Sequence, residues 1–190
     1  MSTGSLTTKT ASRTSVTLAT HRFVNKALAL LLAMTMLAQP TFAVEVGESL
    51  PKLSLPLLID GAQSDRVELG SAYAGKLVYV DVWASWCGPC RQSMPILNDI
   101  RNEFADRGFE VVAVNVDEKL SDALKFLRKR PVDYPILLDP KGTLPRTYEL
   151  VAMPTSYLIG PDGVVLYKHV GFKKSDVDNI RNTIEAFLPE

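Results

Sequence analysis

The chain has 190 residues, of which 21 are Lys or Arg, 21 are Asp or Glu and 2 are Cys. A hydrophobic content of 46% with 22% charged residues indicates a core-forming protein, which excludes wholesale disorder and a disulfide-rich miniprotein. Because the charges balance, the chain has no basic field for phosphates, and no nucleic-acid partner is expected.

The first 43 residues differ from the rest, because they contain four basic residues and no acidic one. An uncharged apolar run, ALALLLAMTMLA, covers 27–38, and the small residue Ala43 follows soon after it. A helix of that length covers about 18 Å, which is short of the roughly 30 Å core of a bilayer. The order predicts a signal peptide over 1–43, with an uncleaved membrane anchor as the alternative. The domain over 44–190 would then be periplasmic or otherwise extracytoplasmic, with a net charge of −4.

From residue 44 onward, runs of β-branched and aromatic residues alternate with segments of helical periodicity. The run LVYVDVWA at 77–84 is apolar at nearly every position, as expected of a strand buried on both faces. The predicted elements are a lead-in at 44–56, a turn at 60–61, strands at 66–69 and 77–84, a helix at 90–106, a strand at 109–116, a helix at 121–130 capped by Ser121, a strand at 135–138, a turn at 139–142, a short helix at 144–150, a hairpin with strands at 155–159 and 164–170, and a helix at 174–188. This order predicts one α/β domain with a central mixed sheet and helices on both faces.

Spacing also predicts which helical residues face the core. The predicted inner residues are Ala123, Leu124 and Leu127 in the helix at 121–130, and Val177, Ile180, Ile184 and Phe187 in the last helix.

The motif WASWCGPCR at 83–91 joins the first buried strand to a helix and contains both cysteines. Two cysteines three positions apart at a helix start can form a disulfide. Unpaired N–H groups and the macrodipole at the helix N-terminus favour a thiolate on the first of them. Cys87 is therefore the predicted nucleophile, and Cys90, one turn into the helix, is the predicted resolving thiol.

Two plainer interpretations compete with a redox role for the pair. A structural disulfide here would enclose only two residues and would stabilise the fold little through chain entropy. A zinc site needs about four ligands, whereas the chain beyond residue 43 offers two Cys and one His. That His169 is expected to be a strand residue without a catalytic role. We expect no metal and no cofactor beyond the redox-active Cys87–Cys90 disulfide.

Asp81 lies in the middle of the apolar run at 77–84, where a buried carboxylate is costly. Burial should raise its pKa and allow it to accept a proton from the Cys90 thiol at neutral pH. The alternative is an Asp near a strand end that reaches water.

The segment Met153-Pro154-Thr155 directly precedes the predicted hairpin. A proline at a strand start after a loop is a candidate for a cis peptide bond, and the sequence leaves cis and trans open. A cis bond would leave the backbone of Met153 free to pair with an extended substrate segment.

With these motifs the chain resembles thioredoxin-fold proteins, and more closely the TlpA/ResA group of exported thiol–disulfide oxidoreductases. The resemblance covers about 46–188 and rests on WASWCGPCRQSMP at 83–95, VVAVNVDE at 111–118, MPT at 153–155 and Gly171-Phe172. It implies a thioredoxin fold with an N-terminal β extension and a helix–strand insertion over about 120–138.

The resemblance also implies roles for single residues. Cys87 would attack and Cys90 would resolve, Asp81 would be the buried acid, and Pro154 would be cis and packed against the cysteine pair. The implied substrate groove consists of Trp86, Gly88, Pro89, Met153, Thr155 and Gly171.

Three positions depart from the family pattern. Ala113 stands where bacterial thioredoxins have a Lys near the buried acid, Ser93 where some ResA-like proteins have a Glu, and Ala152 where the family often has Gly. Substrate preference therefore does not follow from the resemblance.

The Gly-Pro between the cysteines resembles that of thioredoxin. It suggests a reduction potential closer to about −270 mV than to the roughly −120 mV of a strong oxidase. The expected function is reduction of disulfides in exported proteins, such as apocytochrome c haem-binding motifs or a copper-site Cys pair. The electrons would come from a membrane donor of the DsbD/CcdA type. A disulfide oxidase or isomerase, a thioredoxin-fold copper chaperone and a peroxiredoxin-type peroxidase are the alternatives.

Overall fold

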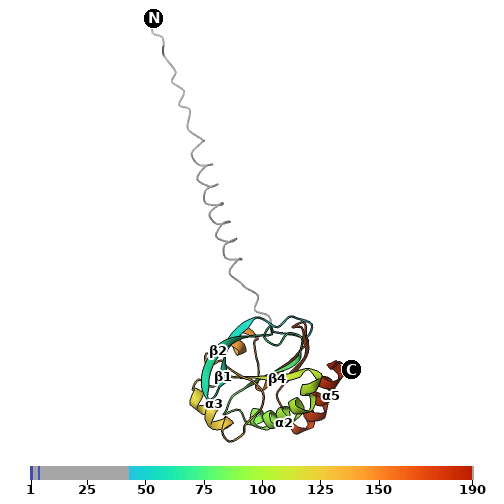
Figure 1. Cartoon of the computed structure of the whole chain (residues 1–190). Coiled ribbons are helices and arrows are strands. Elements are labelled where there is room, and N and C mark those ends of the chain that lie inside the picture. The colour runs from blue at the N-terminus through green and yellow to red at the C-terminus, as the bar shows by residue number, and fades with distance from the viewer. Residues whose placement is uncertain (2–3, 5–42, 190) are drawn as a thin grey trace. The chain divides into compact units, whose positions relative to one another are not determined.

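The computed structural model describes residues 1, 4 and 43–189, and Figure 1 draws the whole chain. The predicted signal peptide or anchor over 1–43 lies almost entirely outside the described residues and stays a prediction. Within the described part, no helix is long and apolar enough to cross a membrane.

A seven-stranded mixed sheet in the order β2-β1-β5-β4-β3-β6-β7 forms the centre of the described residues. Its strands are β1 (Leu53–Ile59), β2 (Ala62–Leu69), β3 (Leu77–Trp83), β4 (Phe109–Asn115), β5 (Ile136–Leu138), β6 (Thr155–Ile159) and β7 (Val165–Val170). The central strands β3, β4 and β5 are parallel, and the outer strands pair antiparallel. Every residue of β3 and β4 is buried, as their apolar runs predict.

Helices cover both faces of this sheet. They are α2 (Gly88–Phe104), α3 (Leu120–Leu127), α4 (Thr143–Thr147) and α5 (Val177–Phe187), with short 3-10 turns η1 (Ala105–Arg107) and η2 (Lys174–Asp176). Buried residues of α2, α3 and α5 join one core cluster, and those of α4 join a second cluster on the opposite face. Figure 1 shows α2, α3 and α5 along the same side of the sheet. The predicted α/β thioredoxin architecture is therefore confirmed.

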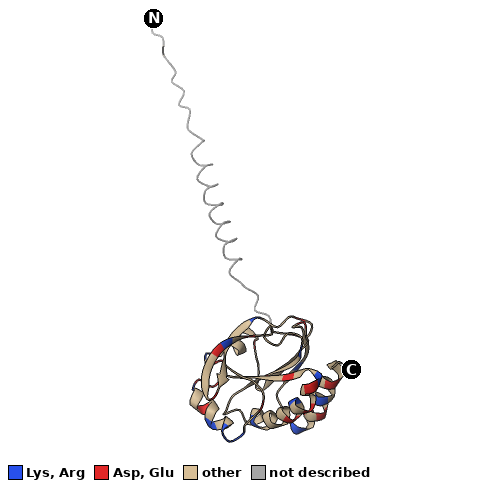
Figure 2. Cartoon of the chain, in the orientation of Figure 1, with Lys and Arg blue, Asp and Glu red and all other residues tan. Residues whose placement is uncertain are grey.

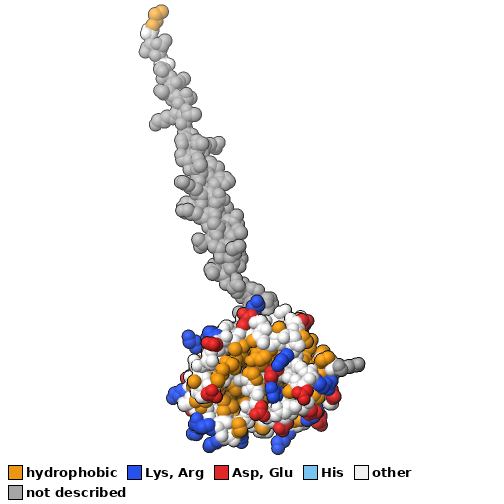
Figure 3. All heavy atoms as spheres, viewed as in Figure 1, with side chains coloured by type: hydrophobic (Ala, Val, Ile, Leu, Met, Phe, Trp, Pro, Cys, Tyr) orange, Lys and Arg blue, Asp and Glu red, His pale blue; other side chains and the backbone are white. Residues whose placement is uncertain are grey.

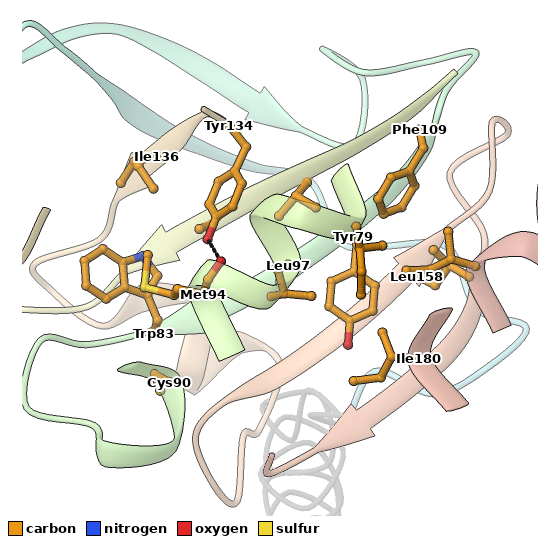
Figure 4. Packing of buried hydrophobic residues seen from close by; sticks show 14 of the residues in the cluster. Tyr79, Trp83, Cys90, Met94, Leu97, Phe109, Tyr134, Ile136, Leu158 and Ile180 are labelled. Atoms are coloured by element: carbon orange, nitrogen blue, oxygen red, sulfur yellow. Dashed lines mark hydrogen bonds between the residues drawn. The ribbon is translucent and has the colours of Figure 1, made fainter. Parts of the chain in front are cut away.

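Alternation along β3 decides which side chains face α2. Tyr79 and Trp83 belong to the cluster of α2, whereas Val80 and Val82 belong to the cluster of the opposite face. Figure 4 shows this packing, with Met94 and Leu97 of α2 against Tyr79 and Trp83. The same alternation directs Asp81 toward α2, the helix that contains Cys90.

The surface combines both charges with exposed apolar atoms. Figure 2 shows acidic and basic residues distributed together over α2, α3 and α5. Figure 3 shows apolar side chains across the middle of one face, with charged side chains mainly toward its rim.

The N-terminal hairpin is more extensive than the sequence indicates. The predicted turn at Asp60-Gly61 is present, but strands run on both sides of it as β1 and β2. The pairing of Leu57 with Leu137 attaches this hairpin to β5. The hairpin and the α3–β5 segment are the two predicted additions to a minimal thioredoxin fold.

Two predictions about helix residues are wrong. Ser121 does not cap α3, because the helix begins one residue earlier at Leu120 and its N-cap Lys119 makes no side-chain capping bond. Phe187 does not face inward: it is 45% exposed, and the chain leaves the helix in an extended conformation at Leu188, which is buried instead. In α3 the buried aromatic residue is Phe126, whose ring lies 5.2 Å from that of Trp83.

The contrast between buried Phe126 and half-exposed Phe187 suggests a matched pair of variants. We expect Phe126→Ala to lower the free energy of unfolding by about 3 kcal/mol, because it opens a cavity against Trp83. Phe187→Ala removes a ring that is about half-exposed, and it should change the free energy of unfolding by no more than about 0.5 kcal/mol. Urea unfolding of the two oxidised variants measures both values, and equal losses would contradict this assignment of the core.

Candidate active site

The two cysteines lie where the buried strand β3 gives way to helix α2. They form a disulfide with a Cα–Cα distance of 5.3 Å, in which Cys87 is nearly buried and Cys90 is fully buried. Cys87 is the N-cap residue of α2, and its Sγ accepts a hydrogen bond from the backbone N–H of Cys90 at 3.2 Å. The first turn of α2 contains no acidic residue. In the reduced protein this environment favours a thiolate on Cys87.

A buried carboxylate anchors the loop that leads to Cys87. Asp117 accepts hydrogen bonds from the Ser85 backbone N–H at 2.9 Å, from Ser85 Oγ at 3.0 Å and from Asn115 Nδ2 at 2.8 Å. These bonds join the ends of β3 and β4, two parallel strands that finish at the same sheet edge. The sequence analysis missed this role. The available signal was a pair of polar residues, Asn115 and Asp117, directly after a buried strand.

Asp81 has no contact with solvent, since its exposed fraction is 0%. Ser156 Oγ donates a hydrogen bond to Asp81 Oδ1 at 2.6 Å, and no described residue provides a partner for Oδ2. Burial raises the pKa of Asp81 from its ordinary value of 3.8 to about 7, and the hydrogen bond from Ser156 opposes part of that rise. The predicted burial is confirmed, and the alternative of a carboxyl that reaches water is excluded.

The loop before β6 brings a second predicted segment to the cysteines. The Met153–Pro154 peptide bond is cis, as the resemblance implies. The Gly171 N–H donates to the carbonyl of Pro154 at 2.8 Å, and Gly171 adopts a φ of +79° that favours glycine. Thr155 Oγ1 donates to the carbonyl of Ala152 at 2.7 Å. Thr155 and Gly171 therefore hold the loop in place, and neither residue lines the cavity above Cys87.

A cavity of about 650 Å³ opens above Cys87. Of the predicted groove residues, it is lined by Trp86, Gly88, Pro89 and Met153. The other lining residues, which the sequence analysis missed, are Val116, Gly142, Pro145, Leu150, Val151 and Ala152. All the lining residues are uncharged, and the apolar side chains of Trp86 and Val151 are 68% and 88% exposed at its rim. Exposed apolar side chains beside the cysteine pair form a candidate interaction surface.

The described residues contain no group of three or more His, Cys, Asp or Glu side chains placed to hold a metal ion.

Comparison with known proteins places this geometry in a family. Residues 45–184 match the family model named Redoxin. The chain belongs to the Redoxin family. The thiol-disulfide oxidoreductase ResA of Bacillus thuringiensis subsp. konkukian is 28% identical over 128 residues, which are 67% of this chain and 71% of that protein. The thiol:disulfide interchange protein CycY of Rhizobium leguminosarum bv. viciae is 38% identical over 102 residues, 53% of either chain.

Solved structures agree with these relatives. A crystal structure from Chlorobium tepidum, described as a thiol:disulfide interchange protein DsbE, has a TM-score of 0.71 and 43% sequence identity. The match covers 77% of this chain and 99% of that chain. This Redoxin-family chain is therefore a thiol–disulfide oxidoreductase with a thioredoxin fold, and the resemblance to the ResA group is confirmed.

The raised pKa of Asp81 predicts how the stability of the oxidised protein varies with pH. The folded chain holds the Asp81 proton up to about pH 7, whereas the unfolded chain releases it near pH 4. The folded state therefore binds more protons between these values, so the free energy of unfolding falls as pH rises and levels off above pH 7. A shift from 3.8 to about 7 corresponds to a loss on the order of 4 kcal/mol.

Asp81→Asn should abolish this loss. Urea unfolding from pH 4 to pH 8 measures the free energy of unfolding. We expect that of the variant to rise relative to that of the wild type between about pH 4 and pH 7. Asp178→Asn, an exposed carboxylate in α5, is the matched control and should follow the wild type. The raised pKa of Asp81 would be contradicted if the free energies of unfolding of the wild type and of Asp81→Asn differed by the same amount from pH 4 to pH 7.

Proposed function

We propose that this protein is an extracytoplasmic reductase of disulfides in exported proteins, with Cys87 as nucleophile and Cys90 as resolving thiol. The observation that carries the proposal is the uncharged lining of the cavity above Cys87. The Cys87 sulfur receives a hydrogen bond from the backbone N–H of Cys90, and no basic side chain of the described residues lines that cavity.

That environment bears on the direction of electron flow. Strong disulfide oxidants owe their high potential to a reduced form in which the nucleophilic thiolate is strongly stabilised. Here the helix N-terminus supplies part of that stabilisation, but the cavity adds no cationic side chain. A modestly stabilised thiolate gives a reducing couple, in agreement with the Gly88-Pro89 dipeptide between the cysteines.

The proposed reaction passes two electrons from the protein to the substrate. The Cys87 thiolate attacks one sulfur of a substrate disulfide, which forms a mixed disulfide and releases the other substrate sulfur as a thiolate. The Cys90 thiol then gives its proton to Asp81, and the resulting thiolate attacks Cys87 Sγ. The Cys87–Cys90 disulfide forms and the second substrate sulfur leaves, so that both substrate sulfurs end as thiols after protonation by solvent.

The cavity supports a polypeptide as the substrate. The backbone of Met153 has no hydrogen-bond partner among the described residues, so it is free to pair with an extended segment that carries the target cysteine. Trp86 and Val151 would contact uncharged residues on either side of that cysteine. The names of the relatives, thiol-disulfide oxidoreductase and thiol:disulfide interchange protein, agree with a role on cysteine pairs. Apocytochrome c haem-binding motifs and copper-site Cys pairs are the proposed substrates.

Export and re-reduction complete the proposal. The basic and then apolar order of residues 1–43 supports delivery across the membrane, with cleavage or retention as an anchor. An oxidising compartment lacks a thiol pool that would reduce Cys87–Cys90 again. A membrane donor of the DsbD/CcdA type, itself a dithiol, would return the two electrons.

The reduction potential of the Cys87–Cys90 couple tests the direction of flow. We expect a value near −270 mV, because the thiolate gains little stabilisation beyond the helix N-terminus. Equilibration with mixtures of reduced and oxidised dithiothreitol, followed by thiol alkylation and mass measurement, gives the potential. A value above about −150 mV would overturn the reductase assignment and favour an oxidase.

Trapping in cells tests the roles of the two cysteines and identifies the substrate. We expect Cys90→Ser to accumulate mixed disulfides with exported proteins, because the resolving thiol is absent. Cys87→Ser, the matched control, should accumulate none, since the nucleophile itself is lost. Non-reducing electrophoresis with mass spectrometry reports both results. Equal adducts with both variants would contradict the assignment.

A further inference from the structure

The proposed reaction requires Asp81 to release a proton as well as accept one. In each turnover Asp81 receives the proton of Cys90, yet its exposed fraction is 0%. In the same step of the proposed reaction, the bound substrate covers the cavity that Cys87 itself lines. The proton therefore needs a path that does not pass through the substrate cavity. This requirement rests on the proposed function.

Ser156 is the first group on such a path. Its hydroxyl is buried and donates to Asp81 Oδ1 at 2.6 Å, while Oδ2 has no partner among the described residues. The two carboxyl oxygens therefore differ, because Oδ1 is held by Ser156 while Oδ2 is left without a hydrogen-bond partner among the described residues. A hydroxyl donates and accepts at the same time, so it can receive the proton of a neighbour as it passes on its own.

The register of the sheet places His169 next to Ser156. Asp81 pairs directly with Ser156 across β3 and β6, and Ser156 pairs directly with His169 across β6 and β7. Directly opposed residues of antiparallel strands project to the same face, with Cβ atoms about 5 Å apart. Asp81, Ser156 and His169 thus form one row across three neighbouring strands.

His169 connects this row with the surface. Its Nδ1 lies 3.1 Å from the hydroxyl of Tyr167, while its buried Nε2 has no hydrogen-bond partner among the described residues. Nε2 lies 3.4 Å from Asp176 Oδ2 in η2, a distance at which a protonated imidazole gains charge stabilisation. The side chains of His169 and Asp176 are 14% and 27% exposed, so water reaches this end of the row.

The other polar groups around the row do not compete for the proton near neutral pH. Burial is the main cause that raises the pKa values of Tyr79, Tyr134 and Tyr167, which keeps these phenols neutral. The pKa of Asp176 is lowered, mainly by the Lys173 backbone N–H that donates to it, so this carboxylate stays charged. The remaining groups that face the row are Cys90 from α2, Lys173 before η2 and Asn179 from α5, which donates to the Tyr167 hydroxyl.

We propose that Ser156 and His169 form the proton path of Asp81, which leaves the protein beside η2, away from the substrate cavity. Cys90 gives its proton to Asp81, and Asp81 gives a proton to Ser156 Oγ. The Ser156 hydroxyl, which donates to Asp81 Oδ1 in this structure, turns toward β7 in this step and passes its own proton to the adjacent His169 imidazole. The imidazolium, held beside the Asp176 carboxylate, then loses a proton to water. One proton enters the row and one leaves it, and each group returns to its starting state. Ser156 is a positioning and transfer residue, and His169 has a role that the sequence analysis did not assign to it.

The link between Ser156 and Asp81 is testable without turnover. The infrared carbonyl band of protonated Asp81, identified by its loss in Asp81→Asn, is titrated in the oxidised protein. The wild-type midpoint should lie near 7, where the pKa of Asp81 is found. Ser156→Ala removes a donor that favours the carboxylate, so the midpoint should move upward, and Ser156→Thr should restore it. An unchanged midpoint in Ser156→Ala would overturn the link.

The role of His169 is tested in a single turnover. The reduced protein reacts at pH 4 with a cysteine peptide activated as its 2-pyridyl disulfide, which loads the peptide on Cys87. The pH is then raised in weak buffer, and release of the peptide thiol reports attack by Cys90. We expect His169→Ala to slow release by about tenfold and added imidazole to restore most of the rate. Lys168→Ala, on the opposite face of β7 against Tyr157, is the matched control and should behave as the wild type.

The outcomes separate this inference from the proposed function. A wild type that never releases the peptide counts against the proposed function, while the infrared titration still tests the Ser156 link. A wild-type release rate in His169→Ala, or a slow rate that imidazole does not restore in a folded variant, overturns the proton path. Unfolding curves of each variant show whether it is folded.

Discussion

The carboxyl group of Asp81, held without solvent contact in the middle of β3, is the constraint on which the rest of the site depends. A charge at this position is costly, and its pKa of about 7 means that the group is close to half-protonated at neutral pH. The fold provides it with one hydrogen bond, from Ser156, and leaves Oδ2 without a partner among the described residues. A stability optimum would favour an apolar residue here, so a buried carboxyl with a raised pKa marks this position as a candidate functional residue.

The cysteines owe their placement to the meeting of several elements at one sheet edge. The parallel strands β3 and β4 end side by side, and Asp117 at the end of β4 fixes Ser85 two residues before Cys87. From the other side, the hydrogen bond from Gly171 to Pro154 holds the cis loop near the same edge. Cys87 is thus fixed between a helix start and two anchored loops, which limits its motion relative to a bound substrate.

The segment around α4 gives the site its individual surface. Pro145, Leu150 and Val151 follow β5 and line the cavity above Cys87 together with Trp86. Among the described residues, no charged side chain lines this cavity, so its surface offers shape and apolar contact rather than ion pairing. In the reduced protein, the N-terminus of α2 and the backbone N–H of Cys90 favour a thiolate on Cys87.

The sequence by itself determined the features that depend on neighbours along the chain. The buried strands β3 and β4, the helix that begins beside Cys87, the hairpin turn at Asp60-Gly61 and the candidate acid Asp81 are all readable from local patterns. Boundaries that depend on packing were less accessible, and the fold decided that Phe187 faces water and Leu188 the core. The partners of the key groups were beyond any local pattern, since Asp117 and Ser85 are 32 residues apart, and Asp81 and Ser156 are 75 apart. Only strand register brings such pairs together, because a shift of one residue turns every side chain to the other face of the sheet. The sequence therefore determined which groups could react, and the tertiary structure decided which groups hold them and which groups cover them.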